Sequence, residues 1–348
     1  MPGNLDRSQL GSIKVAVAGI GNCCSALLQG IQYYHEREGS LGLIHETIGG
    51  FKAKDVEFVS AFDIEPSKID RDVSESIFSP LNSAPKIMDV PRLGVQVVEG
   101  IDGESYENNE AAISRVVNKL VESDAEMLLN LISGNAHKSS RLYAEAAVKA
   151  GCSFINATPA AIACEPTLAK LFEEHDLPLV GDDLLDQVGA TILHMGILEF
   201  LNSRGVRIDE SYQLDVGGGA ESKSTFEKTR DLKRKIKTEI VSTSVPYPFP
   251  LVSGSTDYVD FLGNQRDSFF WFKGRYFSGI PFVMDVKLST IDAPNAGSIL
   301  IDIIRGLKLA RKRGLKGVIH PISSYGFKNA PIKRPVSIAC NEFKQFIQ

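Results

Sequence analysis

Apolar runs of strand length alternate with amphipathic segments over the first half of the chain. Residues 13–18 form one apolar run, and similar runs return at 56–62, 126–132, 152–156 and 177–180. Between them, the segments 108–122, 138–150 and 166–174 place apolar residues at helical spacing. Strands that alternate with helices in this way predict an α/β fold with a doubly wound parallel sheet and helices on both faces.

The pattern changes after residue 198. Residues 211–219 and 257–290 are β-like and contain several Phe residues, and a basic helical stretch at 223–237 lies between them. We interpret this region as a second, mixed layer that is inserted before the chain returns in a helix at 296–313. A sheet rich in aromatic residues that extends beyond a first domain is typical of a subunit interface.

A glycine turn follows the first predicted strand directly. Gly19 permits the turn and Gly21 lets the backbone approach phosphates, which is the geometry that receives a dinucleotide pyrophosphate. Cys24 stands where the third glycine of the common fingerprint would be. The second strand ends in Asp63, whose carboxylate can hold ribose hydroxyls and would repel the extra phosphate of NADP. We therefore predict NAD binding, with a merely structural turn as the alternative. The glycine-containing stretch 31–55 predicts an insertion, either a partial cover over the nucleotide or a plain surface loop.

The composition is that of an ordinary globular protein. The chain has 348 residues, 43% of them hydrophobic and 23% charged, and a formal net charge of −5, which argues against general nucleic-acid binding. The N-terminus, MPGNLDRSQLGS, lacks an apolar core, so we expect no secretory signal, no membrane partner and a cytoplasmic location. The five cysteines have no ligand spacing, and we expect buried reduced thiols. The six histidines show no zinc-binding pattern, and we predict no dedicated metal site.

Seven blocks in order resemble one known family. They are VAVAGIGNCCSALLQGIQYY, FVSAFDIEPSKI, FINATPAAIACEP, VGDDLLDQVGAT, QLDVGGGAE, DAPNAGSILIDIIRGLKLARKRG and HPISSYGFKNAP. Together they resemble the short archaeal and bacterial type of the myo-inositol-1-phosphate synthase (inositol-3-phosphate synthase) family, and they span nearly the whole chain.

The resemblance implies a fold, an assembly and a reaction. It implies a Rossmann-like NAD domain at 1–198 plus 293–348, an inserted catalytic and oligomerisation domain at 199–292, and a homotetramer. The reaction it implies is the redox-neutral cyclisation of D-glucose 6-phosphate to 1L-myo-inositol 1-phosphate, an isomerase activity of inositol and phospholipid biosynthesis. In the family, NAD oxidises C5, an enolate forms at C6, this carbon attacks the C1 aldehyde, and the same cofactor reduces the product.

An enolate and an aldol alkoxide both need fixed positive groups aimed at oxygen. Lys233 and Lys237 are spaced i,i+4 on one predicted helix face and match the family's paired active-site lysines, while Lys328 matches another. The resemblance also places Arg266 and Asp292 near the catalytic centre. A solvated basic face is the alternative for the two helical lysines, and a turn role is the alternative for Asp292.

Further site residues lie where predicted strands end and helices begin. For cofactor binding we predict Gly19, Gly21, Asn22, Cys23, Asp63, Ser133, Asn156, Asp182 and Asp183, where the two last could instead cap a helix. For the substrate phosphate we predict Gln187, Gly189, Ala190 and Thr191. A helper cation near Asp182, Asp183 and Asp186 is left open.

Four positions depart from the family pattern. Arg266 stands where a lysine is usual, Leu185 and Asp186 replace a lysine and a serine, and Gly219 replaces an asparagine. Arginine keeps its charge but does not exchange protons at neutral pH, and Asp186 would tend to repel a phosphate dianion. The alternatives are therefore a paralogue that cyclises another sugar phosphate, a plain NAD-dependent dehydrogenase, and a non-catalytic NAD-binding regulator.

Overall fold

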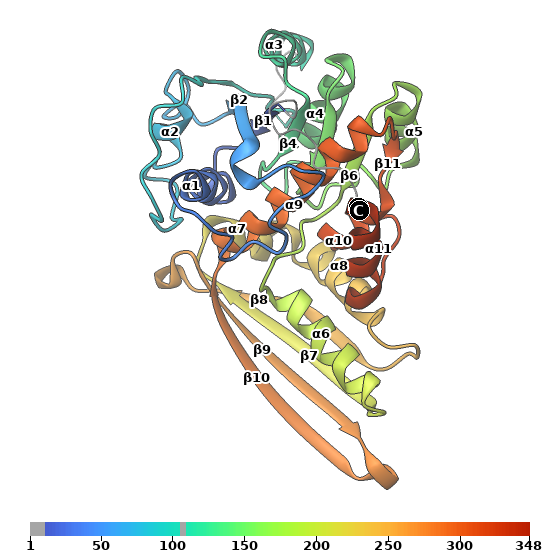
Figure 1. The fold of residues 1–348 in the computed structure, drawn as a ribbon. Coiled ribbons are helices and arrows are strands. Elements are labelled where there is room, and N and C mark those ends of the chain that lie inside the picture. Colours follow the sequence, from blue (N-terminus) through green and yellow to red (C-terminus); the bar gives the residue numbers. More distant parts are fainter. Residues whose placement is uncertain (1–10, 105–108) are drawn as a thin grey trace.

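The computed structural model describes residues 11–104 and 109–348, so the polar segment 1–10 and Asn108 lie outside the described residues. Within this part, seven parallel strands form one sheet in the order β11-β6-β5-β4-β1-β2-β3 (Figure 1). The strands are β1 (Ile13–Ala18), β2 (Val56–Asp63), β3 (Val97–Glu99), β4 (Met127–Asn130), β5 (Ser153–Asn156), β6 (Pro178–Gly181) and β11 (Gly317–Val318). This confirms the predicted doubly wound, Rossmann-like α/β fold.

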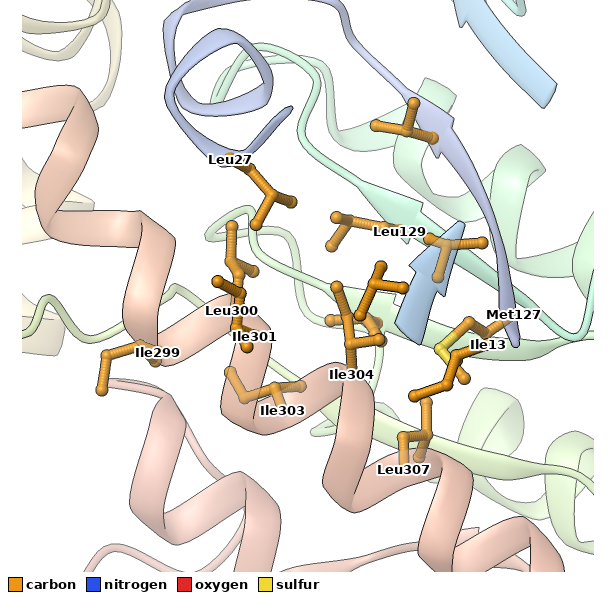
Figure 2. Close-up of a cluster of buried hydrophobic side chains, with 14 of the residues drawn as sticks. Ile13, Leu27, Met127, Leu129, Ile299, Leu300, Ile301, Ile303, Ile304 and Leu307 are labelled. Carbon is orange, nitrogen blue, oxygen red and sulfur yellow. The ribbon is translucent and has the colours of Figure 1, made fainter. Parts of the chain in front are cut away.

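Helices cover both faces of this sheet, as alternation along β1 requires. Val15 and Val17 pack on one face with α1 and α9, whereas Ala16 and Ala18 pack on the other with α3, α4 and α5. Figure 2 shows the apolar side chains of α9 against the first face of the sheet. The helices are α1 (Asn22–Glu36), α2 (Val73–Ser76), α3 (Asn109–Glu122), α4 (His137–Lys149), α5 (Pro166–Glu174), α9 (Asp292–Lys312), α10 (His320–Gly326) and α11 (Val336–Ile347).

A second sheet projects from this body (Figure 1). In the described residues it has four strands in the order β10-β9-β7-β8, namely β7 (Arg207–Gly217), β8 (Leu251–Tyr258), β9 (Gln265–Arg275) and β10 (Pro281–Ile291). Helix α6 (Ala190–Ser203) covers one face of this sheet. Its Met195 and Leu198 share a buried apolar cluster with Phe270 and Phe272 of β9. The helices α7 (Ala220–Ser224) and α8 (Arg230–Ser242) connect β7 to β8.

Two sequence-based boundaries were wrong. The second β-like region begins at Leu251 rather than at residue 257, because β8 contains Ser253, Gly254 and Ser255 and so lacks the alternating apolar pattern of a strand. The last long helix begins at Asp292 rather than at residue 296, since Pro294 is tolerated in a first helical turn. The division into 1–198 plus 293–348 and 199–292 stays a prediction.

The segment 31–55 is only partly a loop. Residues 31–36 continue α1, and the loop beyond them is fixed to α9 by a buried cluster around Asp302 and Arg305. Arg305 Nη2 lies 2.6 Å from Asp302 Oδ1, and the guanidinium also donates to the carbonyl oxygens of His45, Glu46 and Phe51. The main cleft, which the next subsection describes, has no residue of 31–55 in its described lining. The structure therefore supports a packed surface insertion and not a cover over that cleft.

Candidate active site

The main cleft, with a volume of about 330 Å³, lies where the carboxyl ends of β1 and β4 meet α8 and the starts of β9 and α9. In a sheet of this order, β1 and β4 flank the point where the strand order reverses, which is where ligands bind in open α/β folds. Its lining brings together many of the predicted residues from distant parts of the chain: Gly21, Asn22, Cys23, Ser133, Asp183, Lys233, Lys237, Arg266, Asp292 and Lys328.

On helix α8, two lysines that face the cleft differ from the exposed basic residues beside them. Lys233 and Lys237 face the cleft and have little exposed side-chain surface, 13% and 5%. Their basic neighbours on the same helix, Arg234 and Lys235, are exposed. The i,i+4 spacing puts the two side chains on one face, and the solvated-face alternative holds only for the neighbours.

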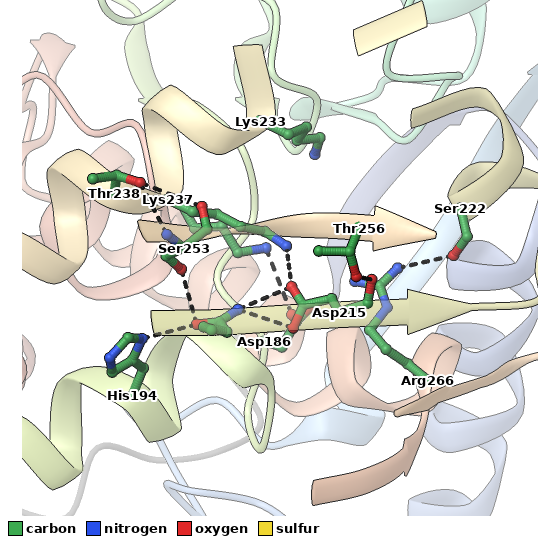
Figure 3. A network of polar contacts seen from close by, with 12 residues as sticks. Asp186, His194, Asp215, Ser222, Lys233, Lys237, Thr238, Ser253, Thr256 and Arg266 are labelled. Atoms are coloured by element: carbon green, nitrogen blue, oxygen red, sulfur yellow. Dashed lines mark hydrogen bonds and ion pairs between the residues drawn. The ribbon is translucent and has the colours of Figure 1, made fainter. Parts of the chain in front are cut away.

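Lys237 is held by a buried polar network under the cleft. Its Nζ donates to Asp215 Oδ2 at 2.6 Å, and Gln213 Nε2 donates to both oxygens of Asp215, at 3.0 and 2.9 Å (Figure 3). Gln213 Oε1 in turn accepts from Ser253 Oγ and lies 3.2 Å from His194 Nδ1. The side chain of Lys237 is thus fixed in position through β7.

The same network shifts the pKa values of its members. Burial lowers the pKa of Lys237 below its ordinary value, and the nearby cations Arg266 and Lys328 lower it further, against the opposing effect of Asp215. Burial disfavours the Asp215 carboxylate, but Lys237 outweighs that and lowers the pKa of Asp215. Burial lowers the pKa of His194 to about 4, so this imidazole is neutral near pH 7. Among the lysines that line the described cleft, Lys237 is therefore the one for which burial favours the neutral amine.

The two adjacent aspartates at the end of β6 have different surroundings. Asp183 lines the cleft, accepts from Lys233 Nζ at 2.8 Å, and keeps Oδ2 buried without a hydrogen-bond partner. Burial raises its pKa, but Lys233 and Lys328 outweigh this, so the pKa of Asp183 lies below its ordinary value.

The side chain of Asp182 points away from the cleft and binds the loop at residues 162–164. It accepts from the backbone N–H groups of Ile162, Ala163 and Cys164 and from Asn156 Nδ2 at 2.7 Å. Burial raises the pKa of Asp182 to about 6. Among the described residues that line the cleft, neither Asp182 nor Asn156 occurs, so their cofactor role stays a prediction. Neither aspartate caps a helix, since Glu165 precedes α5 and Gly189 precedes α6.

Two further ion pairs complete the wall. Arg266 Nη2 donates to Asp292 Oδ2 at 2.8 Å and to Ser222 Oγ at 3.3 Å, which gives Asp292 a partner in the cleft rather than a turn role. Lys328 is buried, and its Nζ donates to the carbonyl oxygen of Leu184 at 2.6 Å and lies 3.5 Å from Asp186 Oδ2. The three predicted lysines and Arg266 therefore converge on one cleft.

The glycine turn has the shape that a dinucleotide needs. Gly19 has φ of +91°, and a Cβ there would lie 2.6 Å from the carbonyl oxygen of Leu131, so no larger residue fits. A Cβ on Gly21 would meet nothing within 4 Å, so the backbone is open toward the cleft, and no side chain caps α1 at this residue. The uncapped start of a 15-residue helix is suited to an anion. Cys24 is buried, consistent with the expected helix–strand packing.

Asp63 stabilises this turn directly. Its Oδ2 accepts from the backbone N–H of Ile20 at 2.8 Å, and buried Lys68 lies 3.4 Å from the same oxygen. Lys68 Nζ also donates to the carbonyl oxygen of Ile20 at 2.9 Å. The ribose role predicted for Asp63 stays a prediction, and Lys68 is a turn-holding residue that the sequence analysis missed.

The predicted phosphate residues lie beside the cleft rather than in its wall. Gln187 Nε2 donates to the carbonyl oxygen of Gly42, Gly189 is the N-cap of α6, and Ala190 and Thr191 are buried in its first turn. Among the residues described as lining the cleft, none belongs to this set, although Asp186 next to them does. Their phosphate role stays a prediction.

Sequence reasoning also missed Asp215 and Gln213. The signal was present, because β7 places Ser211, Gln213 and Asp215 on one face at a spacing of two, and all three are buried. A polar stripe on the inner face of a strand needs partners, which α6 and α8 supply. A strand with such a stripe next to a lysine-bearing helix therefore indicates a lysine-positioning network.

Other predicted features are more ordinary. Cys24 and Cys152 are buried free thiols as expected, but Cys340 on α11 is exposed. Across residues 11–104 and 109–348, no group of three or more His, Cys, Asp or Glu side chains is arranged to hold a metal ion. No helix in those same ranges has the length and apolarity needed to cross a membrane.

Comparison with known proteins agrees with this geometry. A sequence model of the family described as myo-inositol-1-phosphate synthase matches residues 189–293. The chain is 35% identical to the inositol-3-phosphate synthase of Corynebacterium glutamicum over 97% of its own length and 98% of that protein. The crystal structure of Ari2 superimposes with a TM-score of 0.81 at 30% identity, covering 97% of this chain and 98% of that one. An inositol-3-phosphate synthase from Caenorhabditis elegans shares the fold, with a TM-score of 0.78 at 15% identity over 97% and 85% of the two chains.

Proposed function

The chain belongs to the myo-inositol-1-phosphate synthase family, an enzyme family of isomerases, and we propose that it cyclises D-glucose 6-phosphate to 1L-myo-inositol 1-phosphate with recycled NAD. The observation that carries this proposal is the convergence of Lys233, Lys237, Lys328 and Arg266 beside the glycine turn in one cleft. A dehydrogenase would need no such set of cations. Incubation of the protein with this substrate and a substoichiometric amount of NAD tests the proposal, because cyclisation leaves the cofactor unreduced overall and a dehydrogenase does not.

The residues at the glycine turn support NAD as the cofactor. The close approach at Gly19 and the open, uncapped start of α1 at Gly21 suit a pyrophosphate, and Asn22, Cys23 and Ser133 would line the same region. When bound, NAD supplies the acceptor for a substrate hydride and later returns that hydride. A carboxylate at the end of β2, Asp63, favours NAD over NADP.

The chain's own residues would handle protons and negative charge. Lys237, with its lowered pKa, is suited to move a proton at a substrate carbon or oxygen. Lys233 and Lys328 keep positive charge at the cleft wall and would stabilise the enolate and alkoxide oxygens, and Arg266 adds a permanent charge. Asp183, Asp215 and Asp292 would hold three of these cations in fixed positions.

The pH dependence of turnover tests the role of Asp215. Asp215 raises the pKa of Lys237, so Asp215→Asn should lower that pKa further. We expect the limb of the kcat–pH profile that reports Lys237 to move to lower pH, and kcat to fall about 10²-fold at its optimum. The matched control is Glu227→Gln, because Glu227 is an exposed acid in the short helical segment Thr225–Thr229 before α8. This variant should leave the kcat–pH profile unchanged. An unmoved limb in Asp215→Asn would contradict this role.

NAD affinity tests the role of Asp63. Asp63→Ala removes the acceptor for the Ile20 N–H and the proposed ribose contact, so we expect the NAD dissociation constant to rise at least about tenfold. Isothermal titration calorimetry measures this, with Glu57→Ala on the exposed side of β2 as control. NAD affinity equal to that of the parent chain would refute the ribose role of Asp63. In the kcat–pH profile of Asp63→Ala, the limb that reports Lys237 should stay where it is in the parent chain.

The second sheet supports an oligomer, which we propose to be a homotetramer with residues 199–292 as its oligomerisation domain. Opposite the face covered by α6, apolar side chains of three strands are exposed, among them Tyr212, Phe269 and Val283. Tyr212 stacks on Trp271 with ring centroids 5.5 Å apart. Exposed aromatic and apolar side chains on a projecting sheet, here interspersed with Asp285 and Lys287, are typical of a subunit interface.

A further inference from the structure

The cations of the main cleft are all paired. In the described part of the chain, each of its four cations contacts a carboxylate: Lys233 with Asp183, Lys237 with Asp215, Arg266 with Asp292, and Lys328 with Asp186. Asp183, Asp186 and Asp292 line the cleft and Asp215 lies beneath it, so no cation of the described lining stands without a carboxylate beside it. A phosphate ester that binds one of these cations therefore competes with a carboxylate for it.

The contact between Lys328 and Asp186 is the loosest of the four. Its N–O distance is 3.5 Å, whereas the other three pairs are at 2.6–2.8 Å. Lys328 already donates to the carbonyl oxygen of Leu184, so it stays anchored when Asp186 moves. Asp186 has 20% of its side-chain surface exposed, against 3% for Asp183 and 2% for Asp215; Asp292 has 29% but holds Arg266 at 2.8 Å. This aspartate is thus the carboxylate of the cleft that can leave with least loss of hydrogen bonds.

Asp186 also lies against the start of α6. A Cβ on Gly189, the N-cap of that 14-residue helix, would stand 2.6 Å from Asp186 Oδ2. No side chain caps this helix, and its partial positive charge favours an anion at this place. The carboxylate therefore stands between a buried ammonium group and a helix N-terminus, where a small external anion would otherwise be attracted.

We propose that Asp186 is a specificity-determining residue whose carboxylate competes with external anions for Lys328. The inference rests on the proposed function in that Lys328 is taken to be a partner of the substrate phosphate. A small anion gains too little from the cleft to displace the carboxylate. A phosphate ester of a polyol also contacts the other cations through its hydroxyl groups and can displace it. The device reserves the cleft for phosphorylated polyols or sugars and excludes free inorganic phosphate.

Titration of the full chain with inorganic phosphate, in the presence and absence of NAD, tests this directly. We expect Asp186→Asn and Asp186→Ser to bind inorganic phosphate at least about tenfold more tightly than the parent chain, because a like charge has been removed. Asp186→Glu keeps the charge at the same position and should bind phosphate as weakly as the parent. Combining Asp186→Asn with Lys328→Gln should abolish the gain, since the released ammonium group is then missing.

Two outcomes overturn the proposal. One is an unchanged or weaker phosphate affinity in both neutral variants, with thermal unfolding like that of the parent. The other is a gain that persists when Lys328 is also replaced. Because the titration contains no sugar, it is independent of turnover. A gain in the neutral variants of a chain that fails to cyclise glucose 6-phosphate would refute the proposed function and leave standing only the competition between Asp186 and external anions for Lys328.

Discussion

Replacing Lys237 by alanine should lower kcat about 10³-fold while NAD affinity stays equal to that of the parent chain. Lys237 is the buried lysine with a lowered pKa, and it is fixed by Asp215 and Gln213 at the wall of the cleft. In this variant, the substrate atom that exchanges a proton with Lys237 has no proton partner, and the positive charge of the lysine is also missing from the cleft. Steady-state turnover and calorimetric NAD titration together give the two quantities.

The matched control for this variant is Lys235→Ala on the same helix. Lys235 is exposed and its nearest carboxylate oxygen, on Glu239, is 4.0 Å away, so its loss should leave turnover unchanged. Lys237→Arg separates charge from proton exchange, because arginine stays protonated, and it should remain nearly as inactive as the alanine variant. Full activity in Lys237→Ala would mean that the reacting atoms lie elsewhere.

Asp302→Ala should destabilise the fold by about 3–5 kcal/mol, since it leaves the fully buried guanidinium of Arg305 without its counter-charge. Asp302 also accepts from Tyr325 OH at 2.8 Å and lies 2.6 Å from His45 Nδ1, so the loss reaches both the loop that follows α1 and helix α10. Urea and thermal unfolding followed by circular dichroism measure the change.

The exposed pair of Asp176 and Lys316 is the control for this second variant. Its N–O distance of 2.8 Å is close to that of the buried pair, but both side chains are at least half exposed. Lys316→Ala should therefore leave the melting temperature almost unchanged, because solvent screens exposed pairs. If Asp302→Ala melted with the parent chain, the buried cluster would not be what fixes the loop to α9.

The parallel sheet could be predicted because its strands are buried on both faces. Strands such as β1 and β4 are nearly continuous apolar runs, and the helices between them show a clear apolar face, so alternation and type were both visible. The boundaries of β8 were not predictable by the same means. Its small and polar residues satisfy partners on α8, such as Thr238, whose Oγ1 accepts from the Ser253 N–H, and this requirement appears only in three dimensions.

The site was predictable to the extent that its residues lie at short, regular spacing or in blocks that resemble a family. Lys233 and Lys237 were identified because they match paired lysines of the family that the chain resembles, and their i,i+4 spacing agrees with a shared helix face; Gly19 and Gly21 were identified because a tight turn needs them. The different orientations of Asp182 and Asp183 could not be predicted from their adjacent positions in the sequence. Pairings such as Lys328 with Asp186 join residues 142 positions apart and depend on the fold.

The central claim is tested most directly by nuclear magnetic resonance of uniformly ¹³C-labelled glucose 6-phosphate incubated with the protein and substoichiometric NAD. We predict a new coupling between the former C1 and C6, which marks ring closure, with no accumulation of reduced cofactor. An oxidised open-chain product formed in proportion to reduced NAD would contradict the account and identify a dehydrogenase. Unchanged substrate with NAD bound would contradict glucose 6-phosphate as the substrate.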